Sequence, residues 1–395
     1  MLIEKSSINN VDLAGKRVLV RVDFNVPLQE GRVVDDERIR ACLPSLRALR
    51  EQGCRLVLAS HLGRPRGKRV ADLSLRPAAG RLSELIGCPM PLAPDCVGSQ
   101  AEALATKLGT GECLMLENLR FHPEEEANDP AFCRQLAALG EVYVNDAFSA
   151  SHRRHASVAG IVEHFPVAVA GLLMSREIEA LSQVALDPAR PYAAILGGAK
   201  VSDKVLLVDT LLLKVDRLLI GGAMAYPFLA ARGISTGHSL LEARTVETAR
   251  ALLDKAAKLE VPLHLPVDHR VVRDTKSHEP ATDTRSEAID DGDAAVDIGP
   301  RTEKLFADAL SDCRCVLWNG PLGFFEGGHV AGSRAVAEAV VSCGAFSVAG
   351  GGDTAALLHT LDMAGKFSHL STGGGASIEF LSGKTLPGIQ ALNDR

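Results

Sequence analysis

The segment VAGGGDT, residues 348–354, passes from a short apolar run through three consecutive glycines to Asp353 and Thr354. The same order of apolar run, glycines and polar residues recurs at 196–204 (LGGAKVSDK) and at 370–377 (LSTGGGAS). Glycine lets the backbone approach a phosphate closely, and the free N–H groups of a following helix favour its negative charge. These segments therefore predict strand–loop–helix units whose loops bind an anionic group.

Similar apolar runs recur outward from these segments along the whole chain. They alternate with longer segments, such as 38–52 and 202–214, in which apolar residues have helical spacing. The runs are nearly continuous, as strands buried on both faces require, so we predict an α/β fold: two Rossmann-like three-layer domains with mainly parallel sheets. The predicted strands are 17–22, 55–59, 113–116, 141–144, 192–196, 217–220, 262–265, 315–318 and 347–349.

The length of the chain, 395 residues, is typical of two domains. Glycines are denser after residue 170, and they cluster there at predicted strand ends. Between the two halves, residues 172–186 have the pattern of one amphipathic helix, and two prolines follow it closely. We therefore predict a first domain at 1–171, a connecting helix and hinge at 172–187, and a second domain at 188–376.

Composition excludes several classes of protein. A net charge of −6 provides no general attraction to nucleic acid or to a membrane. The nine cysteines are scattered without a CxxC motif, which favours free thiols in a reducing compartment over disulfides or zinc. The chain also shows no signal peptide, and its longest apolar runs are about ten residues, too short to cross a bilayer. We expect a soluble cytoplasmic protein.

Basic and polar residues follow the predicted strands of the first half. The segments are DFN at 23–25, SHLGRP at 60–65, ENLRFH at 117–122 and SHRRH at 151–155, and Arg38 opens the first long helix. One arginine after a strand is usually a solvated side chain. Because ligands bind at the carboxyl ends of parallel strands, several such segments predict a cationic basin for a small ligand with more than one negative charge.

The second half offers lysines and a carboxylate beside its glycines. Lys200 and Lys204 are four residues apart, so on a helix they share one face and reach successive phosphates. Asp353 is a candidate Mg²⁺ ligand, because Mg²⁺ takes one or two carboxylates together with phosphate oxygens. The alternative role of Asp353 or Thr354 is to cap the following helix.

Two common nucleotide motifs are absent. The chain contains no G-x-G-x-x-G segment, which argues against the usual dinucleotide site. Gly383, Lys384 and Thr385 look like the end of a Walker A motif, but Ile378 stands where that motif requires glycine. We therefore expect a nucleotide site of another type.

In chain order, the segments resemble the motifs of the phosphoglycerate kinase family. The resemblance covers essentially the whole chain and implies a monomer that transfers a phosphoryl group reversibly, with Mg²⁺, between ATP and the carboxylate of 3-phosphoglycerate, giving ADP and 1,3-bisphosphoglycerate. The matching segments are RVDFNVP (21–27), SHLGRP (60–65), ENLRFHPEEE (117–126), VNDAF (144–148), GGAKVSDK (197–204), WNGPLGFFE (318–326), GGGDT (350–354) and STGGGAS (371–377).

The resemblance also implies roles for individual residues, and it implies that residues 377–395 pack back onto the first domain. The positions that match the 3-phosphoglycerate site are Asp23, Asn25, Arg38, His61, Arg64, Arg120 and Arg153. Those that match the nucleotide site are Lys204, Glu326, Gly351, Gly352, Asp353 and Thr354, with Asp353 as the metal ligand and Glu326 at the ribose. Those that match the groups around the transferred phosphoryl are Arg38, Lys200, Gly373, Gly374 and Gly375.

The chain departs from the family pattern at a few positions. Residues 221–223 are GGA where three glycines are common, and residues 149–151 are SAS where GTA is common. Arg154 stands beside Arg153, and of the two we expect Arg153 to face the ligand.

Two other classes of protein have two α/β lobes. A dehydrogenase should carry the dinucleotide fingerprint and bind nicotinamide, whereas a periplasmic solute-binding protein should carry an export signal and turn over no ATP. A carboxylate nucleophile is already ionised near neutral pH, so the implied reaction needs no general base, consistent with a sequence that has no obvious Ser-His-Asp arrangement.

Overall fold

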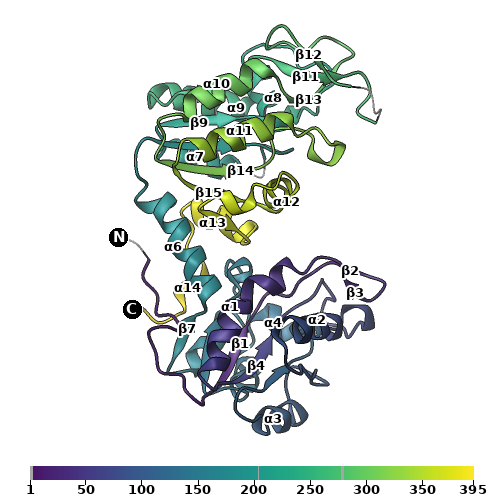
Figure 1. Ribbon diagram of the computed structural model, residues 1–395, viewed down its shortest axis with the longest axis vertical. Helices are drawn as coiled ribbons and strands as arrows, with labels where there is room; N and C mark the ends of the chain where they lie inside the picture. Colours follow the sequence, from purple (N-terminus) through teal and green to yellow (C-terminus); the bar gives the residue numbers. More distant parts are fainter. Residues whose placement is uncertain (1–2, 203, 277–279) are drawn as a thin grey trace. The chain divides into compact units, whose positions relative to one another are not determined.

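The computed structural model describes residues 3–202, 204–276 and 280–395, and these residues form two compact units (Figure 1). The N-terminal unit comprises Ile3–Glu179 and Thr385–Arg395, and the C-terminal unit comprises Ala180–Lys384. The first division falls inside helix α6 (Leu172–Leu186), which matches the residues predicted for one connecting helix.

The chain returns to the N-terminal unit at Thr385, later than the expected position 377. The reason is helix α13 (Gly375–Leu381), which packs on helix α7 (Val205–Leu211) inside the C-terminal unit. The Thr210 hydroxyl also donates to the Ser382 carbonyl at 3.5 Å. Contacts with the nucleotide-side helices therefore hold residues 377–384 in the C-terminal unit.

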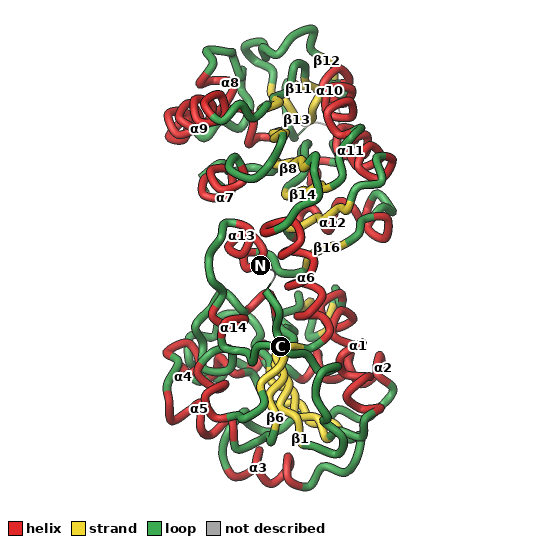
Figure 2. Tube along the Cα trace, turned by 90° about the vertical axis from the view of Figure 1, so that its left-hand side faces the viewer, coloured by secondary structure: helices red, strands yellow, loops and turns green. Residues whose placement is uncertain are grey.

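The N-terminal unit is built on a five-stranded parallel sheet with the order β5-β4-β1-β6-β7. Helices α1 and α2 pack on the sheet face formed by residues such as Val18, Val20 and Leu58, while α4 and α5 lie on the other side (Figure 2). The strands are β1 (Arg17–Arg21), β4 (Arg55–Ala59), β5 (Cys113–Met115), β6 (Val142–Asn145) and β7 (Ala168–Ala170). The helices are α1 (Glu37–Glu51), α2 (Arg76–Ile86), α3 (Ser99–Thr106), α4 (Pro123–Ala127), α5 (Pro130–Ala137) and α14 (Pro387–Gln390).

The C-terminal unit contains a six-stranded parallel sheet with the order β10-β9-β8-β14-β15-β16. The strands are β8 (Tyr192–Leu196), β9 (Arg217–Ile220), β10 (Leu263–His264), β14 (Cys315–Asn319), β15 (Phe346–Gly350) and β16 (His369–Ser371). Besides α7 and α13, the helices are α8 (Tyr226–Ala231), α9 (Val246–Lys258), α10 (Pro300–Leu310), α11 (Ala331–Ser342) and α12 (Gly352–Thr360). The mainly parallel α/β architecture predicted from the sequence is confirmed.

Every predicted strand has a counterpart in the two sheets, and no end differs by more than one residue. The prediction missed β7 and β16, which are only three residues long. It also missed an antiparallel sheet of β11 (His269–Val272), β12 (Thr282–Asp283) and β13 (Ala294–Ile298), and the hairpin β2 (Leu28–Gln29) with β3 (Arg32–Val33). These strands are short or partly polar, so they lack a continuous apolar run.

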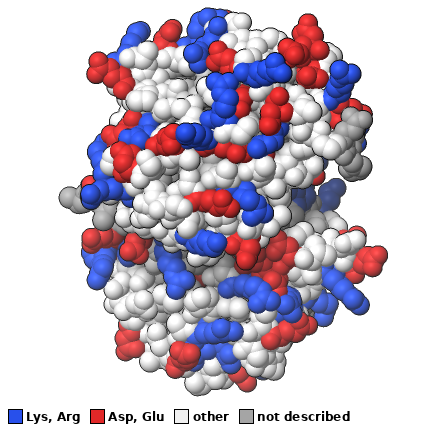
Figure 3. Space-filling model, turned by 45° about the horizontal axis from the view of Figure 1, so that its top comes forward, with Lys and Arg blue, Asp and Glu red and all other residues white. Residues whose placement is uncertain are grey.

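The distribution of charged residues and the state of the cysteines match what the composition predicts. Lysines and arginines are interspersed with acidic residues over the face shown in Figure 3. All nine cysteines are free, and only Cys88 and Cys343 are not buried. Within the described ranges, every helix is too short or too polar to span a bilayer.

Candidate active site

Asp23 lies just beyond the carboxyl end of β1 and organises the basic residues of the N-terminal unit. Its Oδ2 atom accepts a hydrogen bond from Arg38 Nη1 at 2.5 Å, and a second one from the Ser149 hydroxyl. Arg38 stands in the first turn of α1, and Ser149 belongs to the loop after β6. Three segments that are distant in sequence thus meet at one carboxylate.

The loop after β4 is held to this group through Gly63. The Gly63 amide donates to Asn25 Oδ1 at 2.8 Å, and its carbonyl accepts from Arg120 Nη1 at 2.8 Å. The φ angle of Gly63 is +62°, and a Cβ placed there would lie 2.7 Å from the Leu73 side chain. Glycine is therefore required for Asn25 and Arg120 to hold this loop.

Arg21, which the sequence analysis did not single out, lies beneath His61. It is only 1% exposed. Its Nε donates to the Ser157 hydroxyl at 2.9 Å, its Nη1 donates to the Val22 carbonyl, and its Nη2 lies 3.1 Å from Nδ1 of His61. A guanidinium group can only donate, so Nδ1 of His61 is the acceptor and its Nε2 carries the proton. A charged residue at the end of the apolar strand β1 could have marked Arg21 as a candidate, but the strand was interpreted only as a buried apolar run.

The electrostatics of this group follow from burial and from the surrounding cations. Burial acts to raise the pKa of Asp23, but contacts with His61, Arg38 and Ser149 lower it to about 2. Burial lowers the pKa of His61 well below its usual range. Burial, together with the neighbouring Arg153, also lowers the pKa of Arg120 to about 10. The group therefore holds a carboxylate, a neutral histidine and cations that repel one another, a situation that an added anion relieves.

The two arginines after β6 differ in their surroundings. Arg153 is half-buried, and its charge lowers the pKa of both His61 and Arg120, so it faces the group around Asp23. Arg154 is exposed. Arg64, from the loop after β4, is also exposed. Arg153 is thus the less exposed of the two neighbouring arginines, and its contact with a ligand, like that of Arg64, stays a prediction.

In the C-terminal unit, Lys204 ties two strand ends together. Its Nζ donates to the carbonyl of Gly197, after β8, at 2.7 Å and to the carbonyl of Asn319, at the end of β14, at 3.1 Å. The expectation that Lys200 and Lys204 share a helix face is wrong, because α7 begins only at Val205 and the backbone angles of Lys204 are not helical. Lys200 lies in the preceding loop and is exposed.

The loop after β15 leads into helix α12. Gly351, with φ +100°, precedes the helix, and Asp353 lies in its first turn. Thr354 is fully buried and its hydroxyl accepts from the Gly320 amide at 2.7 Å. Neither Asp353 nor Thr354 caps α12 with its side chain, so the capping alternative is not what the structure shows for these two residues. Asp353 is exposed.

A pocket of about 370 Å³ opens beside this loop. The glycine-rich strand ends form one side of it and apolar side chains form another, while Glu326 and Asp353 contribute carboxylates. The residues that line it include Gly198, Gly222, Tyr226, Leu240, Pro321, Phe324, Glu326 and Asp353. A volume of this size, apolar with a few polar groups, is typical of small-molecule sites.

The third glycine cluster follows β16. The Gly373 amide donates to the Ser371 hydroxyl at 3.2 Å, and this hydroxyl lies 2.6 Å from that of Ser377. Gly374 has φ +53°, and Gly375 begins α13. A Cβ placed on Gly374 or Gly375 would meet no atom within 4 Å, so these two glycines are not required by packing.

A magnesium ion fits the donors of this pocket. Mg²⁺ binds hard oxygen ligands and usually keeps several waters, and the exposed carboxylate of Asp353 at the pocket wall is such a ligand. Backbone amides at the start of a helix favour an anion, and oxygens of a bound anion would complete the coordination of the ion.

Comparison with known proteins agrees with this geometry. The phosphoglycerate kinase family model matches residues 8–384. A curated phosphoglycerate kinase of Moorella thermoacetica is 50% identical over 392 residues, 99% of this chain and all of that protein. The solved phosphoglycerate kinase structures from Coxiella burnetii (TM-score 0.89, 38% identity) and Pyrococcus horikoshii (TM-score 0.86, 31% identity) each cover 98% of both chains. The chain thus belongs to the phosphoglycerate kinase family, whose members are phosphotransferases with a carboxyl group as acceptor.

Proposed function

We propose that the two groups of residues divide the family's reaction between them. The N-terminal unit binds 3-phosphoglycerate, and the C-terminal unit binds ATP or ADP with Mg²⁺. The observation that carries this division is the contrast between the two sheet edges: one gathers Arg38, Arg120 and Arg153 around Asp23, and the other presents glycine amides beside an apolar pocket.

The basic group suits an acid that carries both a carboxylate and a phosphate. Arginine presents a planar fork that binds either group through two hydrogen bonds, and Arg64 and Arg153 are exposed or half-exposed enough to do so. Asp23 accepts hydrogen bonds and thereby selects a ligand with a hydroxyl donor. Asn25 and His61 complete this set, with the Nε2 proton of His61 available to an oxygen of the substrate.

The glycine-rich group suits a nucleotide. Gly351, Gly352 and Thr354 would place the phosphates at the start of α12, Lys204 would balance their charge, and Glu326 would accept from the ribose hydroxyls. Asp353 would hold Mg²⁺, which supplies charge neutralisation on the phosphate oxygens when it is bound.

The proposed chemistry is an in-line transfer in which the protein positions and neutralises rather than exchanges protons. The substrate carboxylate attacks the terminal phosphorus of ATP, and the bond from that phosphorus to ADP breaks. Arg38, Lys200 and the amides of Gly373–375 would surround the charge of the transferred group. We also propose that the enzyme acts as a monomer in the cytoplasm.

The test of the activity is a coupled assay with purified protein. In the presence of glyceraldehyde-3-phosphate dehydrogenase and NADH, we expect NADH oxidation that requires ATP, Mg²⁺ and 3-phosphoglycerate together. Oxidation that proceeds without 3-phosphoglycerate, or none with all three, would exclude the proposed reaction.

Replacement of Asp353 tests the metal assignment. We expect Asp353→Ala to raise the apparent KM for Mg-ATP by at least about tenfold, because the metal loses its protein ligand, while the affinity for 3-phosphoglycerate stays unchanged. Asp362→Ala, at the other end of the α12 region, is the matched control. Normal Mg-ATP kinetics in Asp353→Ala would remove Asp353 from the metal site.

A further inference from the structure

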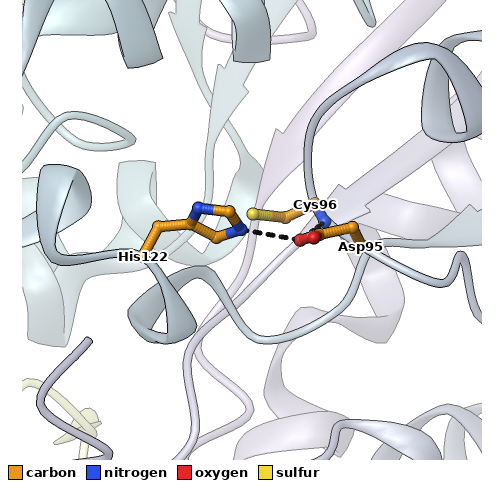
Figure 4. A group of neighbouring side chains, drawn as sticks. All are labelled: Asp95, Cys96 and His122. Carbon is orange, nitrogen blue, oxygen red and sulfur yellow. Dashed lines mark hydrogen bonds and ion pairs between the residues drawn. The ribbon is translucent and has the colours of Figure 1, made fainter. Parts of the chain in front are cut away.

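Asp95, Cys96 and His122 converge at a place in the N-terminal unit that the proposed reaction does not use (Figure 4). One ligand atom from each of the three side chains lies within 4.8 Å of the other two. His122 Nε2 is 2.7 Å from Asp95 Oδ1, and Figure 4 shows the Cys96 sulfur next to this hydrogen bond. A thiol, an imidazole and a carboxylate therefore share one small volume.

The fold brings these residues together from two segments. Asp95 and Cys96 follow a loop that the edge strand β5 anchors, since the Ala93 amide donates to the Met115 carbonyl at 2.8 Å. His122 directly follows the 3₁₀ turn Leu119–Phe121, and its ring lies against that of Phe132, with 5.3 Å between the ring centroids. The hydrogen bond to β5 and the ring contact with Phe132 thus fix the two segments, which limits the motion of the three donors.

The donor set has the character of a transition-metal site. Thiolate, imidazole and carboxylate are the ligands that Zn²⁺ takes, and catalytic or labile zinc sites often use three protein ligands and a water. Asp95 and His122 are partly exposed, which provides access for an ion and for the water. Hard cations such as Mg²⁺ would not select a sulfur ligand.

We propose that Asp95, Cys96 and His122 form a binding site for a transition-metal ion of the Zn²⁺ type, separate from the Mg²⁺ of the nucleotide. In the metal-free protein, a proton occupies each place where the ion would bind. One is the proton shared by Asp95 Oδ1 and His122 Nε2, and the other is the proton of the Cys96 thiol. The ion takes the place of both protons.

Two neighbours set the balance of charge at this site. Arg69 Nη2 lies 3.3 Å from Asp95 Oδ2, but its side chain is 55% exposed and stands over the Phe121 ring, so it can swing into solvent. The backbone amide of Cys96 donates to Asp95 Oδ1 at 2.7 Å and orients the carboxylate. When the ion binds, the proton of the Cys96 thiol passes to solvent, and the proton between Asp95 and His122 moves to Nδ1 of His122, so that Nε2 is free to bind the ion.

The test uses Co²⁺ and Zn²⁺ alone, with the full-length protein free of nucleotide. We expect Co²⁺ to produce a thiolate-to-cobalt charge-transfer band at one equivalent per chain, and Zn²⁺ to displace it. Asp95→Asn, Cys96→Ser and His122→Gln should each weaken Zn²⁺ binding by at least about tenfold, measured by calorimetry, and Cys96→Ser should abolish the band.

A matched control comes from a pair of neighbouring thiols outside the proposed site. The sulfurs of Cys88 and Cys113 lie 3.9 Å apart, so they are the alternative source of a thiolate–cobalt band. We expect Cys88→Ser to retain the band, and Asp353→Ala to retain it too, because that residue belongs to the nucleotide site. A band lost in Cys88→Ser but kept in Cys96→Ser overturns the proposal.

A second measurement does not depend on whether the variants fold. X-ray absorption at the zinc edge of the wild-type protein with one equivalent of Zn²⁺ should show one sulfur neighbour together with nitrogen or oxygen neighbours. A coordination shell without sulfur, or the absence of any charge-transfer band with Co²⁺, excludes the site whatever the activity of the enzyme.

Discussion

Asp23 joins two partners whose roles differ. Arg38 reaches it from α1 with a 2.5 Å hydrogen bond and remains 38% exposed, whereas Ser149 reaches it from the loop after β6. Asp23 therefore positions the Arg38 guanidinium while leaving most of its donors available. The hydrogen bond from Ser149 to Asp23 joins positions 126 residues apart, so it could not be inferred from the sequence alone.

Removal of Arg38 should impair catalysis more than substrate binding. We expect Arg38→Ala to lower kcat about 10²–10³-fold, the usual cost of losing one donor to a developing charge, with a smaller change in KM for 3-phosphoglycerate. Steady-state kinetics measure both. Arg40→Ala is the control, because Arg40 stands on the same helix but pairs with Asp36 at 2.7 Å. An unchanged kcat in Arg38→Ala would refute the catalytic role.

The low pKa of Asp23 should appear in the acid stability of the N-terminal unit. The pKa is lowered from 3.8 to about 2, so the stabilisation is complete above pH 4 and is lost as the pH falls through about 2. A shift of this size corresponds to about 2 kcal/mol. Unfolding at pH 6 and pH 2 should show a pH dependence that is smaller in Asp23→Asn by about this amount, and unchanged in the exposed-site variant Asp12→Asn. Equal pH dependence in all three proteins would contradict the assignment.

Among the elements, the turns after the strands of the C-terminal sheet depend on close backbone packing. Gly320 follows β14 with φ +101°, and a Cβ there would lie 2.2 Å from the Gly197 carbonyl oxygen and 2.7 Å from Lys204 Nζ. The ends of β8 and β14 can therefore approach each other, and Lys204 can bridge them, only because residue 320 is glycine.

Substitution of Gly320 should disrupt the nucleotide side selectively. We expect Gly320→Ala to weaken ATP binding by at least about tenfold, because the added methyl group displaces Lys204 and strains a positive φ angle. Calorimetric titration with Mg-ATP measures this. Gly365→Ala, where a Cβ would meet no atom within 4 Å, should bind ATP normally. Wild-type affinity in a folded Gly320→Ala protein would mean that Lys204 has no part in the site.

The chain forms two units that each have a sheet of their own, and the proposed reaction would be shared between them. The proposed acceptor site lies in one unit and the proposed donor site in the other. Helix α6 begins in the first and ends in the second, so it belongs to both. Transfer of a phosphoryl group then requires a conformation in which both substrates are held together and water is excluded.

Small-angle scattering tests this requirement. We expect the radius of gyration to fall when 3-phosphoglycerate and Mg-ADP are both present, and to change little with either ligand alone, because only the pair of ligands provides interactions that span the units. The same compaction with one ligand would argue against a closure that requires both.

Much of this organisation can be derived from the order of residues along the chain. Apolar runs of strand length separated by helical segments specify parallel sheets, and the glycine clusters after β8, β15 and β16 specify where a backbone can approach a phosphate, because both are local properties of the chain. The strands that were not predicted, such as β7 and β16, are too short to show a pattern of apolar residues. The start of α7 was placed three residues too early, because Lys204 instead donates to the carbonyls of Gly197 and of the distant Asn319.

Local patterns along the chain were enough to predict the fold class and one helix at residues 172–186, and they supplied candidate site residues whose roles stay predictions. Which side chains meet could be read only from the packed fold. Asp23 accepts hydrogen bonds from Arg38 and Ser149. The buried Arg21 sets the tautomer of His61, and Cys96 lies close to His122. The two kinds of information differ in how far apart along the chain the interacting residues are. Propensity and periodicity act between neighbours along the chain, whereas a hydrogen bond or a metal site depends on which distant segments the packed core brings within about 3 Å.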